Sequence, residues 1–206
     1  GRMRLASDEE IATLAGAGAV ALQGNVLTVS GGADTTFSGV ASGTGGALVK
    51  NGSGVFTLTG ANTFDGGVTL NGGAIQAGNA AALGTGILTF TGGRLSSDSV
   101  TARTLSNVLS LTGGLALGDV TNNGALTLSG NATLTGATTL TVASAATLGG
   151  IVSGTFDLVK DGAAELTLSG ANTFSGTTTV NGGTLTLTGG NALANSMAVT
   201  VNAGGL

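Results

Sequence analysis

Apolar and polar residues alternate in short runs along most of this chain, and the clearest run is ELTLS at 165–169. Alternation with a period of two indicates a β-strand, because successive side chains point to opposite faces. We therefore expect Leu166 and Leu168 to point into the core. The same pattern recurs at 184–188, where the inward residues are expected to be Leu185 and Leu187.

Corners rich in glycine and asparagine interrupt these strands. Gly-Ala-Asn stands at 60–62 and again at 170–172, and Gly and Asn tolerate left-handed backbone angles that other residues avoid. The side-chain amides of Asn62 and Asn172 are expected to bond to backbone at these corners, with ligand binding as the alternative. Two residues further on, Phe64 and Phe174 are expected to stack in the core.

One long stretch of the chain occurs twice. Residues 48–73 and 158–183 align without a gap and are identical at 16 of 26 positions. The separation of the two copies equals five periods of about 22 residues. Leu168 and Leu187 are as far apart in the sequence as Leu58 and Ala77. The chain is therefore expected to return to an equivalent strand after roughly twenty residues, and stacked turns can bury an apolar face that one turn cannot.

These spacings predict an all-β fold, a parallel β-helix or β-solenoid. Roughly nine rungs of about 22 residues, at about 4.8 Å per rung, would make a rod roughly 45 Å long.

The remaining sequence fits one domain over residues 7–206, preceded by residues 1–6 as a frayed end or a cloning remnant. Ser7 and Glu10 have the spacing of a helix capping box, so a short capping helix is one interpretation and an imperfect first rung is the other. Residues 100–111 are expected to extend outside the rod.

The repeated stretch carries a family resemblance. LVK(N/D)G, followed by GANTF(D/S)G and (L/V)NGG, resembles the passenger-associated transport repeat of bacterial autotransporters, also called the autotransporter-associated β-strand repeat. A looser resemblance covers residues 7–46. The resemblance implies a right-handed β-helical passenger, exported by type V secretion to the cell surface. It also implies an outer-membrane barrel at the C-terminus of the same parent chain, so the sequence is interpreted as a fragment of a longer passenger.

Composition narrows the possible partners. The net charge is −4 and no Lys/Arg cluster is present, which argues against binding of nucleic acid or an anionic membrane. No apolar run approaches the roughly 20 residues that span a bilayer, and no signal peptide is recognisable. The chain has no Cys, and the resemblance implies the same, because exported passengers tend to avoid disulfides.

The residue types also limit the chemistry. The chain has no His, Cys, Tyr or Trp, so Ser–His–Asp catalysis and His/Cys metal sites are excluded, and no cofactor is expected. Asp157, Asp161 and Glu165 lie close in sequence to Lys160 and are the candidate carboxylate cluster, with solvated turn residues as the alternative. No calcium-binding nonapeptide repeats along the chain. Outward threonines are either ordinary strand residues or a ladder that binds ice, and they comprise Thr57, Thr59, Thr167, Thr186 and Thr188.

Three functions follow from these observations. The first is a non-enzymatic stalk that holds a distal region away from the cell. The second is an adhesin or self-associating rod that binds glycan, matrix or an identical chain. The third is an enzyme of the β-helical lyase or glycosidase type, which needs two carboxyl groups about 5–10 Å apart.

Overall fold

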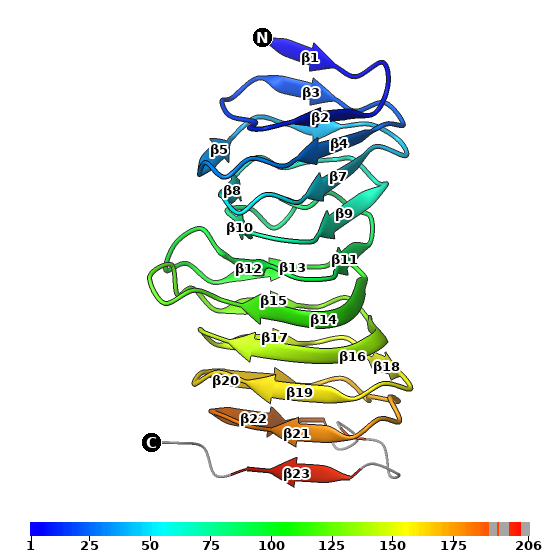
Figure 1. Cartoon of the computed structure of the whole chain (residues 1–206), viewed down its shortest axis with the longest axis vertical. Coiled ribbons are helices and arrows are strands. Elements are labelled where there is room, and N and C mark those ends of the chain that lie inside the picture. The colour runs from blue at the N-terminus through cyan, green and yellow to red at the C-terminus, as the bar shows by residue number, and fades with distance from the viewer. Residues whose placement is uncertain (190–192, 194–197, 203–206) are drawn as a thin grey trace.

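The computed structural model describes residues 1–189, 193 and 198–202. In these residues the secondary structure is entirely β, and the strands pair in parallel and stack as a β-solenoid of about ten turns (Figure 1). The predicted fold is confirmed, with one more turn than expected. At about 4.8 Å per rung the stack is roughly 45–50 Å long.

Each turn passes three faces of the rod, and the first two faces form one continuous sheet. The first face holds β2 (Glu9–Ile11), β4 (Val26–Val29), β7 (Ala47–Lys50), β9 (Gly67–Leu70), β11 (Leu88–Phe90) and β18 (Val152–Gly154). The second face holds β5 (Thr35–Phe37), β8 (Val55–Leu58), β10 (Ala74–Ala77), β12 (Arg94–Ser97), β19 (Leu158–Asp161), β21 (Thr178–Val180) and β23 (Val199–Val201). Two long strands bend across both faces, β14 (Leu109–Leu117) and β16 (Ala132–Val142).

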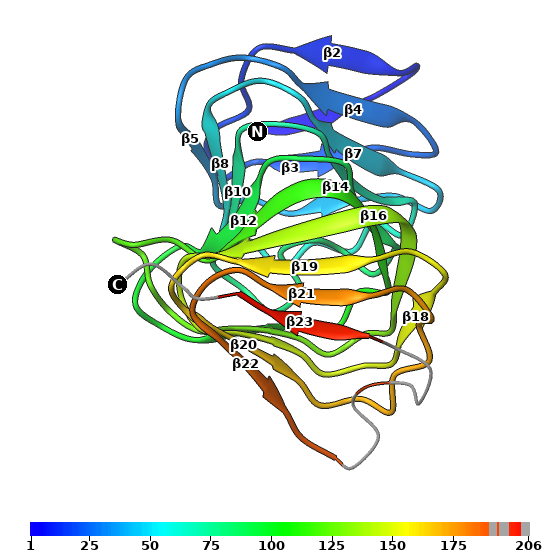
Figure 2. The ribbon, with the colours of Figure 1, turned by 60° about the horizontal axis from the view of Figure 1, so that its bottom comes forward.

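The third face carries two shorter sheets. One contains β1 (Arg2–Arg4), β3 (Ala19–Ala21) and β6 (Ala41–Ser42). The other contains β13 (Arg103–Leu105), β15 (Leu126–Leu128), β17 (Ala146–Leu148), β20 (Glu165–Leu168) and β22 (Thr184–Leu187). Figure 2 shows β20 and β22 on a different side of the rod from the stacked β19, β21 and β23.

Most turns of the rod are slightly shorter than the period expected from the sequence. On the first face, Leu48 pairs with Val68 and Val68 with Leu88, so each of these turns takes about 20 residues. The step from Leu109 to Ala132 is longer, because the chain makes a detour in that turn. Both register pairs expected from the sequence are confirmed, since Leu58 pairs with Ala77 and Leu168 with Leu187.

The core is a set of inward columns that run the length of the rod. Alternate side chains of most strands are buried, as in the pattern of β16, and their apolar members form one continuous cluster. Five of the six phenylalanines are fully buried there, and they are Phe37, Phe56, Phe64, Phe90 and Phe174. Each rung depends on its neighbours for this burial, as expected for a solenoid.

The N-terminal residues are ordered into the stack, which corrects the expectation of a frayed end at 1–6. Strand β1 pairs with β3, and the side chain of Leu5 is buried in the core cluster. The interpretation of Ser7 and Glu10 as the start of a capping helix is also wrong, because β2 forms in this segment and pairs with β4. An imperfect first rung is therefore the correct interpretation of this segment.

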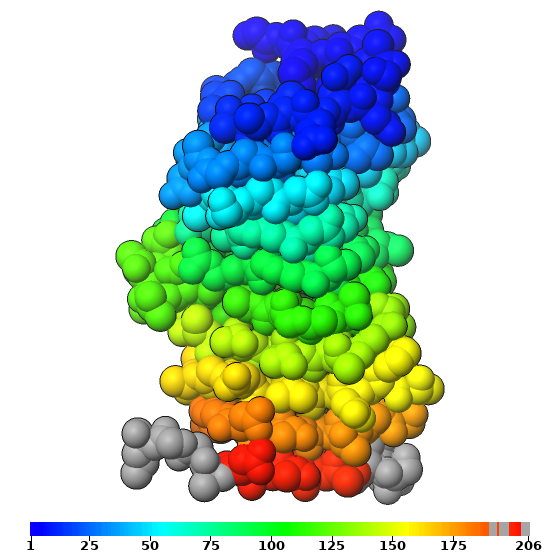
Figure 3. Space-filling view, viewed as in Figure 1, coloured from blue at the N-terminus to red at the C-terminus, as the bar shows by residue number. Residues whose placement is uncertain are grey.

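Two loops interrupt the smooth outline of the rod at mid-length. Residues 98–102 and 118–125 form the green projection in Figures 1 and 3, and we call them the protruding loops. The amide of Gly124 donates to the carbonyl of Ser99 (3.0 Å), which joins the two loops. The expectation that all of 100–111 leaves the rod is wrong, because Leu105, Leu109 and Leu111 are buried and draw β13 and the start of β14 into the stack.

Candidate functional site

The repeat buries a lysine in each copy, which sequence reasoning missed. Leu48 and Lys50 lie on the same side of β7, and Leu158 and Lys160 do so in β19, so alternation places both lysines in the core. Lys50 is 1% exposed and Lys160 is 0% exposed. The signal was present in the sequence, because Leu-Val-Lys alternates like every other strand here.

The ammonium groups bind backbone carbonyls at the corner that follows each strand. Lys160 Nζ donates to the carbonyl oxygens of Asp161 (3.0 Å), Gly162 (2.7 Å) and Gly182 (2.8 Å). Gly182 belongs to the following rung, so the lysine joins two successive turns. Lys50 Nζ donates to the carbonyl of Gly52, two residues further along its own turn.

Glycine is needed beside the ammonium group of Lys50. Gly73 has φ +63°, and a Cβ there would lie 2.8 Å from Lys50 Nζ and closer still to two carbonyl oxygens. The carbonyls therefore converge on the ammonium because no side chain separates them. Burial lowers the pKa of both Lys50 and Lys160, and Asp34 and Asp161 respectively oppose that shift.

Asn62 bonds to two neighbouring rungs at once. Its Oδ1 accepts from the amide of Ala41 (2.7 Å) in the preceding turn, and its Nδ2 donates to the carbonyl of Ala82 (2.5 Å) in the following turn. Asn172 is also buried, and its Oδ1 accepts from the amide of Val152 (2.8 Å). Both asparagines lie outside the strands, and their amides bond to the backbone of neighbouring turns.

A third asparagine has a similar position without the Gly-Ala-Asn signature. Asn107 Nδ2 donates to the carbonyls of Gly84 (3.2 Å) and Gly86 (2.8 Å) in the preceding turn. The sequence did not indicate this role for Asn107, because Ser106 stands before it where the two repeats have Gly-Ala.

The apolar residues of the repeat lie as follows. Phe64, Phe174, Leu166 and Leu168 are buried. Leu185 is half-buried and packs against the core cluster. Leu187 differs from expectation, because it is 44% exposed. Strand β22 is the last of its sheet in the described residues, so no described strand lies over Leu187.

The two copies of the repeat lie on different sides of the rod. LVK forms β7 on the first face in one copy and β19 on the second face in the other. Five successive pairings carry the first face from Leu48 to Val152, and Leu158 lies beyond Val152, one face further on. The separation of the two copies is therefore not the five whole turns predicted from the sequence.

The candidate carboxylate cluster is not assembled. Asp157 Oδ1 accepts from the amide of Thr177 (2.7 Å), and this bond lowers the pKa of Asp157. Asp161 Oδ1 accepts from Gly162 at the other end of β19, and Glu165 accepts from the hydroxyl of Thr186. Lys160 Nζ donates its hydrogen bonds to backbone carbonyls rather than to a carboxylate. Each acid thus caps a separate turn or rung.

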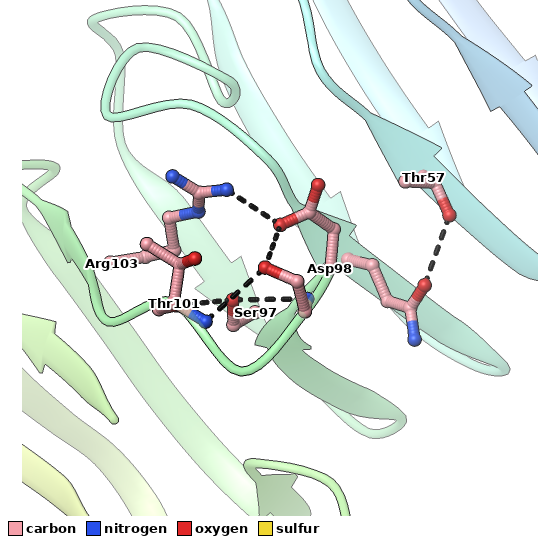
Figure 4. A network of polar contacts seen from close by, with 7 residues as sticks. Thr57, Ser97, Asp98, Thr101 and Arg103 are labelled. Atoms are coloured by element: carbon pink, nitrogen blue, oxygen red, sulfur yellow. Dashed lines mark hydrogen bonds and ion pairs between the residues drawn. The ribbon is translucent and has the colours of Figure 1, made fainter. Parts of the chain in front are cut away.

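The largest polar network lies at the base of the protruding loops. Arg103 donates to Asp98 Oδ1 (2.8 Å), and Asp98 and Ser97 also bind the loop through Ser99 and Thr101 (Figure 4). Arg94 of the same rung pairs with Asp119 of the next rung at 2.5 Å. The amide of Thr121 is the main reason that the pKa of Asp119 is lowered, and Arg94 contributes to the shift.

Outward threonines form a regular row on the third face. Thr127 and Thr147 pair in register, as do Thr147 with Thr167 and Thr167 with Thr186. Thr104 begins this row on β13. Thr57 lies on the second face instead, where its hydroxyl donates to Gln76 Oε1 (3.0 Å).

Two further findings concern metals and membranes. Within the described ranges, His, Cys, Asp and Glu side chains form no group of three that could hold a metal ion. None of the described residues belongs to an apolar helix of bilayer-spanning length.

Comparison with known families identifies the repeat. The family described as the passenger-associated-transport-repeat matches residues 48–77 and 158–187. The chain thus carries two such repeats, which agrees with the resemblance to autotransporter passengers, and together they cover less than a third of its length. The comparison with curated proteins and the comparison with solved structures gave no match.

Proposed function

We propose that these two transport repeats belong to a rigid, non-enzymatic stalk, a β-solenoid segment of a type V secreted surface protein. The stalk presents a distal region of its parent chain away from the cell. Its location is the cell surface or the extracellular space, tethered through the C-terminal outer-membrane barrel that such a parent chain carries.

One observation carries this proposal: the buried polar residues shared by the two copies serve the stack. Lys50 and Lys160, and likewise Asn62 and Asn172, are identical between the copies, and all four are buried against backbone of their own or an adjoining rung. Such residues hold rungs together and offer nothing to a partner.

The placement of the copies supports the same function. Because they lie one face apart around the axis, their shared surface residues form no continuous stripe along one side. A binding face built from repeats requires that equivalent residues align. The carboxylates considered for catalysis are each engaged in turns, which favours a scaffold over a glycosidase.

Sedimentation velocity over a range of concentrations tests the stalk. We expect an elongated monomer whose sedimentation coefficient does not depend on concentration beyond ordinary non-ideality. Reversible growth with concentration would contradict a simple stalk and would favour contacts between identical rods.

The threonine row on the third face favours a second candidate, an adhesin or self-associating rod. Its five threonines, Thr104 to Thr186, lie on consecutive rungs of the third face. A panel of glycans and matrix proteins tests this function. Binding that is lost when Thr127, Thr147 and Thr167 are changed together to Lys would support it, and silence across the panel would count against it.

A further inference from the structure

The first face of the rod carries a regular column of hydroxyl groups. From Thr28 to Ser153, the outward residue of each strand pairs in register with its equivalent on the next rung, through seven consecutive rungs. Val49 is the one member of this column without a hydroxyl. Successive members are about 4.8 Å apart, so the column is roughly 29 Å long. Its hydroxyl-bearing members are Thr28, Thr69, Thr89, Ser110, Thr133 and Ser153.

An apolar column runs along one side of these hydroxyls. Its members stand two residues before those of the hydroxyl column, and backbone bonds join them to the next rung, as from the amide of Leu88 to the carbonyl of Val108 (2.8 Å). Three of its side chains are large and exposed, namely Ile87 (53%), Val108 (49%) and Ile151 (42%). Single exposed aliphatic side chains are ordinary on a protein surface, whereas a group of them marks an interaction site.

A polar column lies on the other side of the hydroxyls, over four rungs. Asn71 Nδ2 donates to Asn51 Oδ1 (2.8 Å), and the hydroxyl of Thr91 donates to Asn71 Oδ1. Ser30 begins this column, and its amide continues the backbone pairing of its strand. These bonds fix the side chains relative to the rungs, and Thr, Val and Ile are stiff at χ1. We call the three columns the first-face array, which is pre-organised for binding.

The outward side chains of the first-face array carry no charge. They belong only to Ala, Gly, Val, Ile, Ser, Thr and Asn. Lys50 lies within these strands but is buried, and Glu10 pairs with Thr28 from the rung before the array begins. A mineral surface or a charged polymer is attracted by charges of the opposite sign, so neither fits this face.

The regularity of the array defines its partner further. A small ligand is held in a concave site where a few polar groups converge, whereas these side chains point outward from parallel rungs. An array that repeats in two directions matches a partner that also repeats in two directions, which is the surface of a crystal. Crystalline polysaccharide is held by aromatic rings that stack on sugars, but the chain has no Trp or Tyr and the array has no Phe.

Ice is the crystal that fits this chemistry. Hydroxyl and amide groups form hydrogen bonds to ordered water that are nearly as favourable as direct ones, and aliphatic groups restrict the orientation of the water beside them. We propose that the first-face array binds ice. This function is additional to the stalk, because it uses the outward side chains of strands whose inward side chains hold the stack together.

The other two faces do not offer the same surface. Thr57 and Thr167, which the sequence suggested for an ice-binding ladder, lie on the second and third faces. On the third face Glu165 stands outward beside Thr167. On the second face Asp157 and Asp161 flank the outward Val159.

Partition of the unaltered chain into growing ice tests the proposal. An ice crystal is grown slowly in a dilute solution of the chain, and the protein concentration in the ice is compared with that in the remaining liquid. We expect the chain to be enriched in the ice relative to serum albumin, which growing ice excludes. Exclusion of the chain to the same extent as albumin would overturn the proposal. Retention on crystalline cellulose or chitin without enrichment in ice would also overturn it.

Two matched double variants locate the site. Thr89→Lys with Thr133→Lys adds two long charged side chains to the array, and Thr139→Lys with Thr179→Lys makes the same change on the second face. In each pair the threonines point outward between buried neighbours, two rungs apart in the stack.

The two variants should differ in ice and agree in stability. We expect the first-face variant to lose its enrichment in ice and the second-face variant to keep it, while thermal unfolding shows both chains folded. Enrichment that survives in the first-face variant, or that is lost equally in both folded variants, would overturn the assignment to the first face. If either variant fails to fold, the partition of the unaltered chain still decides whether the rod binds ice.

Discussion

Replacing Asn62 by alanine tests how the rod is held together where strands do not pair. Asn62 is 1% exposed, and its amide is bonded to the amide of Ala41 and the carbonyl of Ala82. Both backbone groups lie in other turns, so the substitution leaves a donor and an acceptor without partners on two rungs.

The size of the effect follows from these two groups. A buried backbone group left unsatisfied costs about 1–3 kcal/mol, which gives about 2–6 kcal/mol for the pair. Freeing the side chain returns up to about 1 kcal/mol of conformational entropy. We therefore expect Asn62→Ala to lower the free energy of unfolding by about 1–5 kcal/mol.

Asn71→Ala is the matched control from the same repeat. Asn71 is exposed, and its side chain bonds to the side chains of Asn51 (2.8 Å) and Thr91. Surface changes of this kind stay within about 0.5 kcal/mol. The two variants delete the same chemical group, so their difference isolates burial and bonding to backbone.

Denaturant unfolding followed by circular dichroism measures the stability difference, and hydrogen exchange locates it. The amide of Ala41 should lose protection in Asn62→Ala and keep it in Asn71→Ala, because Asn62 Oδ1 is the acceptor for that amide. If the two variants unfold alike and Ala41 stays protected in both, the reasoning about Asn62 is refuted.

Four further predictions concern the core, the charges and the turns. Phe174→Ala should cost about 3–5 kcal/mol because the ring is fully buried, and an unchanged thermal transition would show that the assignment of this corner to the core is wrong. Burial lowers the pKa of Lys50 and Lys160 from 10.5, so the unfolded chain binds more protons and stability should rise as pH increases from the lowered values toward 10.5; Lys160→Met should reduce that rise in a pH series of denaturant midpoints. Asp119 has its pKa lowered from 3.8, so its contribution is present above that value and should be lost as pH falls through the native pKa, a loss absent in Asp119→Asn. Gly183→Ala should destabilise the rod by more than about 1 kcal/mol, because Gly183 has φ +62° and a Cβ would lie 2.6 Å from two carbonyl oxygens, and its thermal unfolding checks this.

Alternation and the recurring spacing of the inward residues were sufficient to predict the fold class and two strand registers. These two patterns predict the register because each strand of a solenoid buries one face. A shift of the register by one residue would turn Leu58 or Leu168 out of the core. The burial of Lys50 and Lys160 obeys the same rule. It was missed because a lysine is ordinarily a surface residue, and its carbonyl partners come from a turn that only the folded chain brings near.

Other features depend on contacts that no local pattern encodes. The exposure of Leu187 reflects the absence of a described strand over β22, and alternation within the strand carries no information on that neighbour. The order at residues 1–6 comes from pairing with β3, which lies one turn later in the chain. The Arg94–Asp119 pair joins two rungs across a detour whose length the repeats do not specify.

The offset between the two transport repeats gives the rod a property that stacking alone does not. Each turn passes three faces, so a segment about a third of a turn long advances the chain by one face. A loop that lengthens or shortens the chain by that amount between repeats therefore changes the azimuth of everything that follows, while every rung stays paired. Insertions or deletions between the repeats of such a protein would therefore change the direction in which later loops project around the axis. The repeats themselves would not need to change.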